Sequence, residues 1–141
     1  MEKKDNQTNN DCIFCKIAKQ EIPSIKIWED DKHLAILDIN PNTEGMTLVT
    51  TKKHYESDFT TMPDKAYKEL MIASKEVAKI LKKQLKVNRV ASVIEGLGVN
   101  HIHVKLYPIY PSNESEGYIT TKLGPRKSNE ELKKMADKIK T

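Results

Sequence analysis

One long amphipathic stretch in the middle of the chain constrains the fold most. From Ala66 onward, apolar residues keep the spacing of one helical face, and they predict a helix that ends near Lys86. The apolar residues on this face are Leu70, Ala73, Val77, Ile80, Leu81 and Leu85. Pro63 stands where a first-turn proline would, Asp64 follows it, and Asn88 is expected to break the helix. A chain of 141 residues fits one domain with one core.

Short alternating or apolar segments on both sides of this helix predict strands. They cover residues 25–28, 33–39 and 46–51 before the helix, and residues 89–95 and 99–107 after it. Residues 29–32 and 40–45 have turn and loop composition. Gly96, Leu97 and Gly98 predict a tight turn that joins the last two strands as an antiparallel hairpin.

The two ends of the chain predict shorter elements. Residues 1–10 are polar and predict a disordered tail, and Asp11 is expected to cap a helix through Lys19 with Ile13, Phe14 and Ile17 on its apolar face. An S-x-x-E capping box at Ser128–Glu131 predicts a second short helix to about residue 139. The expected fold is α+β, an antiparallel five-stranded sheet with one long central helix and short N- and C-terminal helices. The expected divisions are a tail at 1–10, a domain at 11–110 and an extension at 111–141.

Composition excludes some classes of protein. There is no run of about 18 apolar residues and no apolar signal-peptide core, so we expect a cytoplasmic protein without a membrane span. The net charge of +4 favours anionic partners only slightly. Nucleic acid is disfavoured, because no long Lys/Arg block occurs with interleaved aromatic residues.

The segment from Asn100 to Pro108 carries the most chemistry. On a strand its side chains alternate, so His101, His103, Lys105 and Tyr107 would share one face, while the apolar residues between them are buried on the other. Such a face could hold a phosphate, a metal ion or both. The alternative interpretation makes His103 an ordinary half-exposed strand histidine.

Cys12 and Cys15 have the C-x-x-C spacing of a zinc half-site. A structural disulfide is not expected in the reducing cytosol. A redox dithiol is the competing interpretation, but that motif normally follows a strand and opens a thioredoxin-like unit, which this context does not resemble.

The run His-Ile-His-Val-Lys-Leu-Tyr at 101–107 resembles the histidine triad (HIT) motif, His-φ-His-φ-His-φ-φ with φ apolar. Further segments similar to that family occur in the right order at residues 12–17, 21–23, 29–31, 37–39, 48–49 and 52–54, so the resemblance covers roughly residues 11–110. It points to the bacterial-type branch with a zinc-binding cysteine pair, and it implies a HIT-like fold and a homodimer.

The resemblance also implies a reaction and a site. His103 takes the place of the nucleophile that attacks a nucleotide α-phosphate and forms a covalent nucleotidyl-histidine, with Lys105 and His101 beside it. The implied ligand is a purine nucleotide or a dinucleoside polyphosphate. The implied nucleotide-binding residues are Phe14, Ile17, Ile22, Asp38, Ile39 and Asn100. The implied ligands of a structural zinc ion are Cys12, Cys15, His54 and His101, and His33 lies outside this set as a surface or strand-start histidine.

The apolar nucleotide-binding residues and Asp38 also have an alternative role that involves no ligand. For the apolar residues it is core packing, and for Asp38 it is an exposed carboxylate at the end of a strand. This chain also departs from the family pattern, with Lys105 at the third motif histidine, Met46 where a histidine is common, Ile94 where an asparagine is common, and a short loop at 95–101. A charged lysine cannot relay a proton at neutral pH as a histidine does. Three hypotheses follow: a slow nucleotide hydrolase or transferase, a noncatalytic nucleotide-binding protein of the same fold, and a nucleic-acid or protein interaction module.

Overall fold

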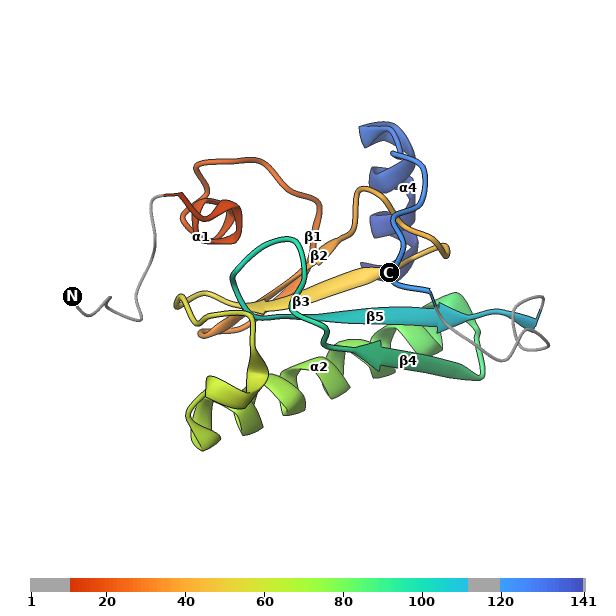
Figure 1. Ribbon diagram of the computed structural model, residues 1–141. Coiled ribbons are helices and arrows are strands. Elements are labelled where there is room, and N and C mark those ends of the chain that lie inside the picture. The colour runs from red at the N-terminus through yellow and green to blue at the C-terminus, as the bar shows by residue number, and fades with distance from the viewer. Residues whose placement is uncertain (1–10, 112–119, 141) are drawn as a thin grey trace.

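The computed structural model describes residues 11–111 and 120–140, and the expected tail at 1–10 lies outside them (Figure 1). Within these ranges the chain forms an antiparallel five-stranded sheet in the order β1-β2-β3-β5-β4. The strands are β1 (Lys26–Glu29), β2 (His33–Leu37), β3 (Thr47–Thr51), β4 (Arg89–Val93) and β5 (His103–Ile109). The helices are α1 (Ile13–Ala18), the 3-10 helix η1 (Phe59–Thr61), α2 (Asp64–Leu85) and α4 (Asn129–Lys140). The predicted α+β fold is confirmed.

Helices cover both faces of the sheet, because successive strand residues point to opposite sides. In β2, Ala35 and Leu37 join the main core with α2, whereas Leu34 and Ile36 join a second cluster with Phe14 and the cysteines of α1. Figure 1 shows α1 and α2 on opposite sides of the sheet. Helix α4 packs against α2 and β1 and adds Leu132, Ala136 and Ile139 to the main core.

The capping box that opens α4 is confirmed. The backbone N–H of Ser128 donates to Glu131 Oε1 at 3.0 Å, and the backbone N–H of Glu131 donates to Ser128 Oγ at 3.1 Å. These two reciprocal bonds satisfy donors that the first turn of a helix leaves without partners.

The predicted cap of α1 is wrong, whereas the predicted end of α2 near Lys86 is confirmed. Cys12, not Asp11, caps α1, because its Sγ accepts from the backbone N–H of Cys15 at 3.3 Å. Helix α2 ends at Leu85, next to the predicted end, because Lys86 takes the left-handed conformation (φ 57°), and the break therefore comes two residues before Asn88.

The last strand begins four residues later than predicted. Residues 94–102 form the connection between β4 and β5, a longer loop than the tight turn expected at 96–98. The backbone of Ile102 donates to Tyr55 O at 2.9 Å, and its carbonyl accepts from Thr50 Oγ1 at 2.7 Å. These bonds hold residues 101–102 against the loop after β3, so His101 is not part of β5.

The apolar stripe of α2 supports a stability prediction with an internal control. Leu81 is 0% exposed and Ile72, on the same helix, is 61% exposed. We expect Leu81→Ala to lower the free energy of unfolding by about 2–5 kcal/mol, because it removes packed methyl groups and leaves a cavity. Ile72→Ala should change it by less than about 1 kcal/mol. Urea unfolding of both variants measures this, and equal losses would contradict the assignment of the buried stripe.

Candidate active site and metal centre

Four cysteine and histidine side chains from distant segments meet at one end of the sheet. They come from α1 and the residue before it, from the loop after β3, and from the loop before β5, and they are Cys12, Cys15, His54 and His101. All four are buried, and their ligand atoms lie within 4.8 Å of one another. The structure therefore brings together the whole set that the resemblance implies.

Hydrogen bonding defines the tautomer of His101. Its Nε2 lies 2.7 Å from the carbonyl oxygen of Thr51, and a carbonyl can only accept, so Nε2 carries the proton. The unprotonated Nδ1 faces Cys12 Sγ at 3.2 Å, Cys15 Sγ at 3.4 Å and His54 Nδ1 at 3.3 Å. Burial lowers the pKa of His101 to about 4, against the bond to Thr51, so the ring is neutral. A neutral ring whose outer nitrogen donates to a carbonyl is the usual state of a metal-binding histidine.

The donor set fits a tetrahedral zinc ion. Zinc binds thiolate sulfur at about 2.3 Å and imidazole nitrogen at about 2.0–2.1 Å, which requires sulfur–nitrogen separations of about 3.5 Å. Cys15 Sγ lies 3.3 Å from His54 Nδ1, close to that value. The buried Cys2His2 cluster is thus consistent with a zinc site, with all four positions supplied by protein.

His103 is the first residue of β5 and lies on the α1 side of the sheet, opposite Thr50 of β3. Its Nδ1 lies 2.7 Å from the carbonyl oxygen of His101, so Nδ1 carries the proton and Nε2 keeps its lone pair. The ring is 4% exposed, and Phe14 packs edge-on against it with ring centroids 5.2 Å apart.

Several groups act on the pKa of His103. Burial lowers it most, the bond to the His101 carbonyl opposes this, and the Lys105 ammonium lowers it further. The carboxylates of Glu95 and Asp38 raise it. The net direction is downward, which favours the neutral imidazole that a nucleophile needs.

Lys105 follows His103 by two residues on the same face and is 9% exposed. Its Nζ lies 3.1 Å from Glu95 Oε2, in an ion pair whose side chains are 11% and 16% exposed. Sequence reasoning missed Glu95. The signal that could have found it is a carboxylate that closes an apolar strand, close to a lysine on the strand expected to pair with it.

Two of the residues implied for the nucleoside line one hollow, and a third contacts the catalytic histidine candidate. Ile17 and Ile22 line a hollow of about 220 Å³ together with Leu34, while Phe14 lies against His103. Asp38 is 8% exposed, so the alternative interpretation of this residue as an exposed carboxylate is wrong. Its Oδ1 accepts a hydrogen bond from the backbone N–H of Asn40 at 2.8 Å.

The other two nucleoside candidates differ in their surroundings. Ile39 is 47% exposed, which excludes plain core packing for that side chain. The Asn100 side chain accepts from the backbone N–H of Ser57 at 3.0 Å, a contact that joins two loops.

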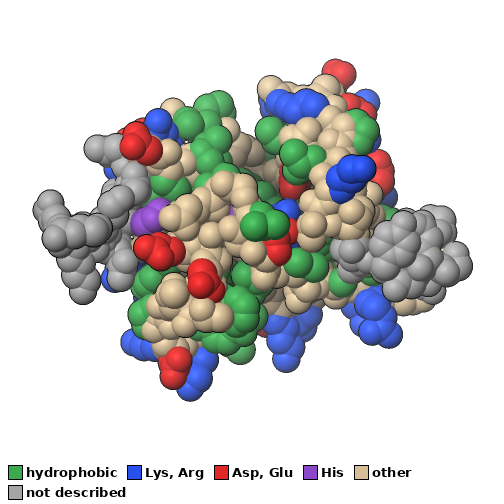
Figure 2. Space-filling view, viewed as in Figure 1, with side chains coloured by type: hydrophobic (Ala, Val, Ile, Leu, Met, Phe, Trp, Pro, Cys, Tyr) green, Lys and Arg blue, Asp and Glu red, His purple; other side chains and the backbone are tan. Residues whose placement is uncertain are grey.

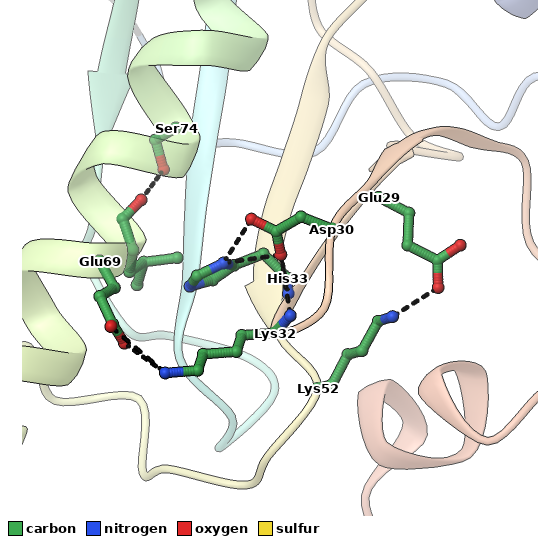
Figure 3. A network of polar contacts seen from close by, with 8 residues as sticks. Glu29, Asp30, Lys32, His33, Lys52, Glu69 and Ser74 are labelled. Atoms are coloured by element: carbon green, nitrogen blue, oxygen red, sulfur yellow. Dashed lines mark hydrogen bonds and ion pairs between the residues drawn. The ribbon is translucent and has the colours of Figure 1, made fainter.

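His33 lies outside the cluster, as predicted, and starts β2. It is 5% exposed, so the surface interpretation is wrong, and its Nδ1 lies 3.0 Å from Asp30 Oδ1 (Figure 3). His33 borders a hollow of about 320 Å³ that both acidic and basic side chains line, and two of these, Lys32 and Glu69, form an ion pair at 3.3 Å.

Comparison with known proteins agrees with this architecture. The HIT domain model matches residues 19–111, and an uncharacterised HIT-like protein of Methanocaldococcus jannaschii is 38% identical over 133 residues, which cover 92% of this chain and 98% of the relative. The chain therefore belongs to the HIT family.

Solved structures extend the comparison. A zinc-bound histidine triad family protein from Mycobacterium smegmatis superposes with a TM-score of 0.69 at 27% identity, covering 92% of this chain and 90% of that one. A HIT family hydrolase from Clostridium thermocellum gives a TM-score of 0.65 at 27% identity, covering 74% and 95%. Among residues 11–111 and 120–140, no helix has both the length and the apolar character needed to cross a membrane.

Proposed function

We propose that this protein is a nucleotide hydrolase or nucleotidyl transferase that reacts at an α-phosphate through a covalent nucleotidyl-histidine on His103. The observation that carries the proposal is the 2.7 Å contact between His103 Nδ1 and the His101 carbonyl. It leaves Nε2 as the nitrogen with a lone pair, and no hydrogen bond occupies that atom among the described residues. Family membership supports nucleotides as ligands, and the solved family hydrolase supports hydrolysis.

The reaction would proceed in two displacements at phosphorus. His103 Nε2 forms a bond to the α-phosphorus, and the leaving group departs with the electron pair of its own bond to phosphorus. The Nδ1–H bond to the His101 carbonyl stabilises the charge that the ring gains. The Lys105 ammonium would neutralise charge that grows on the phosphoryl oxygens. Water or another acceptor then takes the nucleotidyl group.

The nucleoside would lie on the α1 side of the sheet. We assign Phe14, Ile17, Ile22 and Ile39 to the base, Asp38 to the ribose hydroxyls and Asn100 to the rim of the site. The position of Phe14 against His103 supports this orientation, because the base would lie beside the reacting phosphate.

We also propose that the Cys2His2 cluster holds a structural zinc ion, and the likeness to a zinc-bound histidine triad protein supports this proposal. Cys12, Cys15, His54 and His101 would be its ligands. With no open position for water, the ion would tie α1 to the start of β5 and thereby place His103. The homodimer that the resemblance implies stays a prediction.

The adduct itself is the test of the proposed reaction. Incubation of the protein with an adenosine phosphoramidate or a dinucleoside polyphosphate should produce AMP and a protein species heavier by one nucleotidyl group, read by intact mass. AMP binding measured by calorimetry separates the alternatives. Binding without adduct or product from several substrates would favour a noncatalytic nucleotide-binding protein.

The interaction-module hypothesis makes a different prediction. It requires single-stranded nucleic acid to bind with a steep dependence on salt concentration. On the face shown in Figure 2, acidic and basic side chains are interspersed and form no continuous basic area, which supports the nucleotide proposal instead.

A further inference from the structure

The Glu95 carboxylate has one paired oxygen and one unpaired oxygen. Oε2 accepts from Lys105 Nζ at 3.1 Å, whereas Oε1 is buried and has no hydrogen-bond partner. An enclosed carboxylate oxygen without a donor is unfavourable, because it loses its water and gains nothing in return. Such an atom therefore calls for a ligand or a water that donates to it.

Glu95 is placed beside the reacting histidine. Glu95 follows the last residue of β4 by two positions, its carboxylate pairs with Lys105 Nζ at 3.1 Å, and it lies close enough to His103 to raise the pKa of that ring. Lys105 and His103 point to the same face of β5 because they are two residues apart. The unpaired oxygen thus belongs to the same end of the sheet as His103 Nε2.

The residue in the third motif position cannot accept a proton. A lysine ammonium is a donor only, and the Nζ of Lys105 already donates to Glu95 Oε2 at 3.1 Å. The neighbouring carboxylate is an acceptor with one oxygen available. We propose that Glu95 Oε1 is the general base for hydrolysis of the nucleotidyl-His103 intermediate, taking a proton from the attacking water. This inference rests on the proposed function.

The water oxygen forms a bond to the α-phosphorus while one of its protons passes to Glu95 Oε1. The bond between phosphorus and His103 Nε2 breaks, and its electron pair returns to Nε2. A nucleoside monophosphate leaves, and Glu95 gives its proton to solvent. Lys105 acts as a positioning residue, because its contact with Oε2 holds the carboxylate so that Oε1 is the oxygen left without a partner in the resting site, ready to accept from a water that enters with the substrate.

The test separates formation of the adduct from its breakdown. Wild-type protein and Glu95→Gln are mixed with excess adenosine phosphoramidate, quenched over time and read by intact mass. Glutamine keeps the shape of the side chain and accepts from Lys105, but it is not a base. We expect the adduct to form in Glu95→Gln and to accumulate on most of the protein, with hydrolysis slowed by about 10²- to 10⁴-fold. Glu95→Asp should restore part of the breakdown rate.

The control is a second Glu–Lys pair away from the site. Glu69 pairs with Lys32 at 3.3 Å, so Glu69→Gln removes a comparable carboxylate and should leave both rates unchanged (Figure 3). If the adduct of Glu95→Gln breaks down at the wild-type rate, the proposed role of Glu95 is overturned, and the proposed function still stands. Slower formation without accumulation would also overturn the role of Glu95, in favour of a structural or phosphate-positioning role. Absence of adduct and product from the wild-type protein would overturn the proposed function as well.

Discussion

Replacement of His103 with alanine is expected to abolish the nucleotidyl adduct and to reduce AMP release by at least about a thousandfold. The adduct is lost because the substitution removes the reacting atom, His103 Nε2. Nε2 is the nitrogen that the bond from Nδ1 to the His101 carbonyl leaves unprotonated, and alanine offers no nucleophile in its place. Lys105 cannot substitute, because an ammonium has no lone pair to offer and its Nζ already contacts Glu95 at 3.1 Å.

Intact mass after incubation with adenosine phosphoramidate measures the adduct, and chromatography measures AMP. His33→Asn is the matched control, since it alters a buried histidine on β2 that lies outside the proposed site. Zinc content and thermal unfolding of His103→Ala should show that the fold persists. Adduct on His103→Ala at the wild-type level would exclude this residue as the nucleophile.

The second large effect concerns the metal centre. Protein purified without chelators should contain about one zinc ion per chain, and Cys15→Ser should contain almost none, because loss of one of four ligands opens the site. Cys15 is 0% exposed and contacts both histidines of the cluster. A ligand that binds only the folded state adds about 4 kcal/mol when its free concentration is a thousand times its Kd. We therefore expect zinc loss to lower the free energy of unfolding by about that amount.

Urea unfolding with and without a chelator separates the metal from the side chain. The chelator should destabilise the wild-type protein nearly to the level of Cys15→Ser and should have no effect on Cys15→Ser itself. Any remaining difference is the packing cost of the serine. Wild-type protein that holds no zinc and unfolds identically with the chelator would contradict the metal assignment.

The two predictions are linked through neighbouring residues. His101 belongs to the Cys2His2 cluster, and its carbonyl accepts from His103. Removal of zinc should therefore slow adduct formation as well as lower stability, because the carbonyl that orients the nucleophile would lose its anchor.

Local patterns in the sequence determined most of the elements. Helical spacing of apolar residues predicted α2, and the reciprocal Ser128–Glu131 box predicted where α4 begins. These signals are local, since a helical face and a cap depend on residues three or four apart. The C-x-x-C spacing marked Cys12 and Cys15 as a possible zinc half-site, but the two histidine ligands came from resemblance alone, because Cys12 and His101 are 89 residues apart and no periodicity relates them.

Tertiary structure decided what depends on long-range packing. Contacts of residues 101–102 with the loop after β3 removed His101 from the strand and placed it among the cysteines. The Cys12 sulfur caps α1 because it faces the Cys15 backbone, and neighbouring Asp11 has an equally suitable side chain by sequence. Glu95 gained its importance only when β4 and β5 paired, because burial and an unpaired oxygen are properties of a packed environment and not of a residue type.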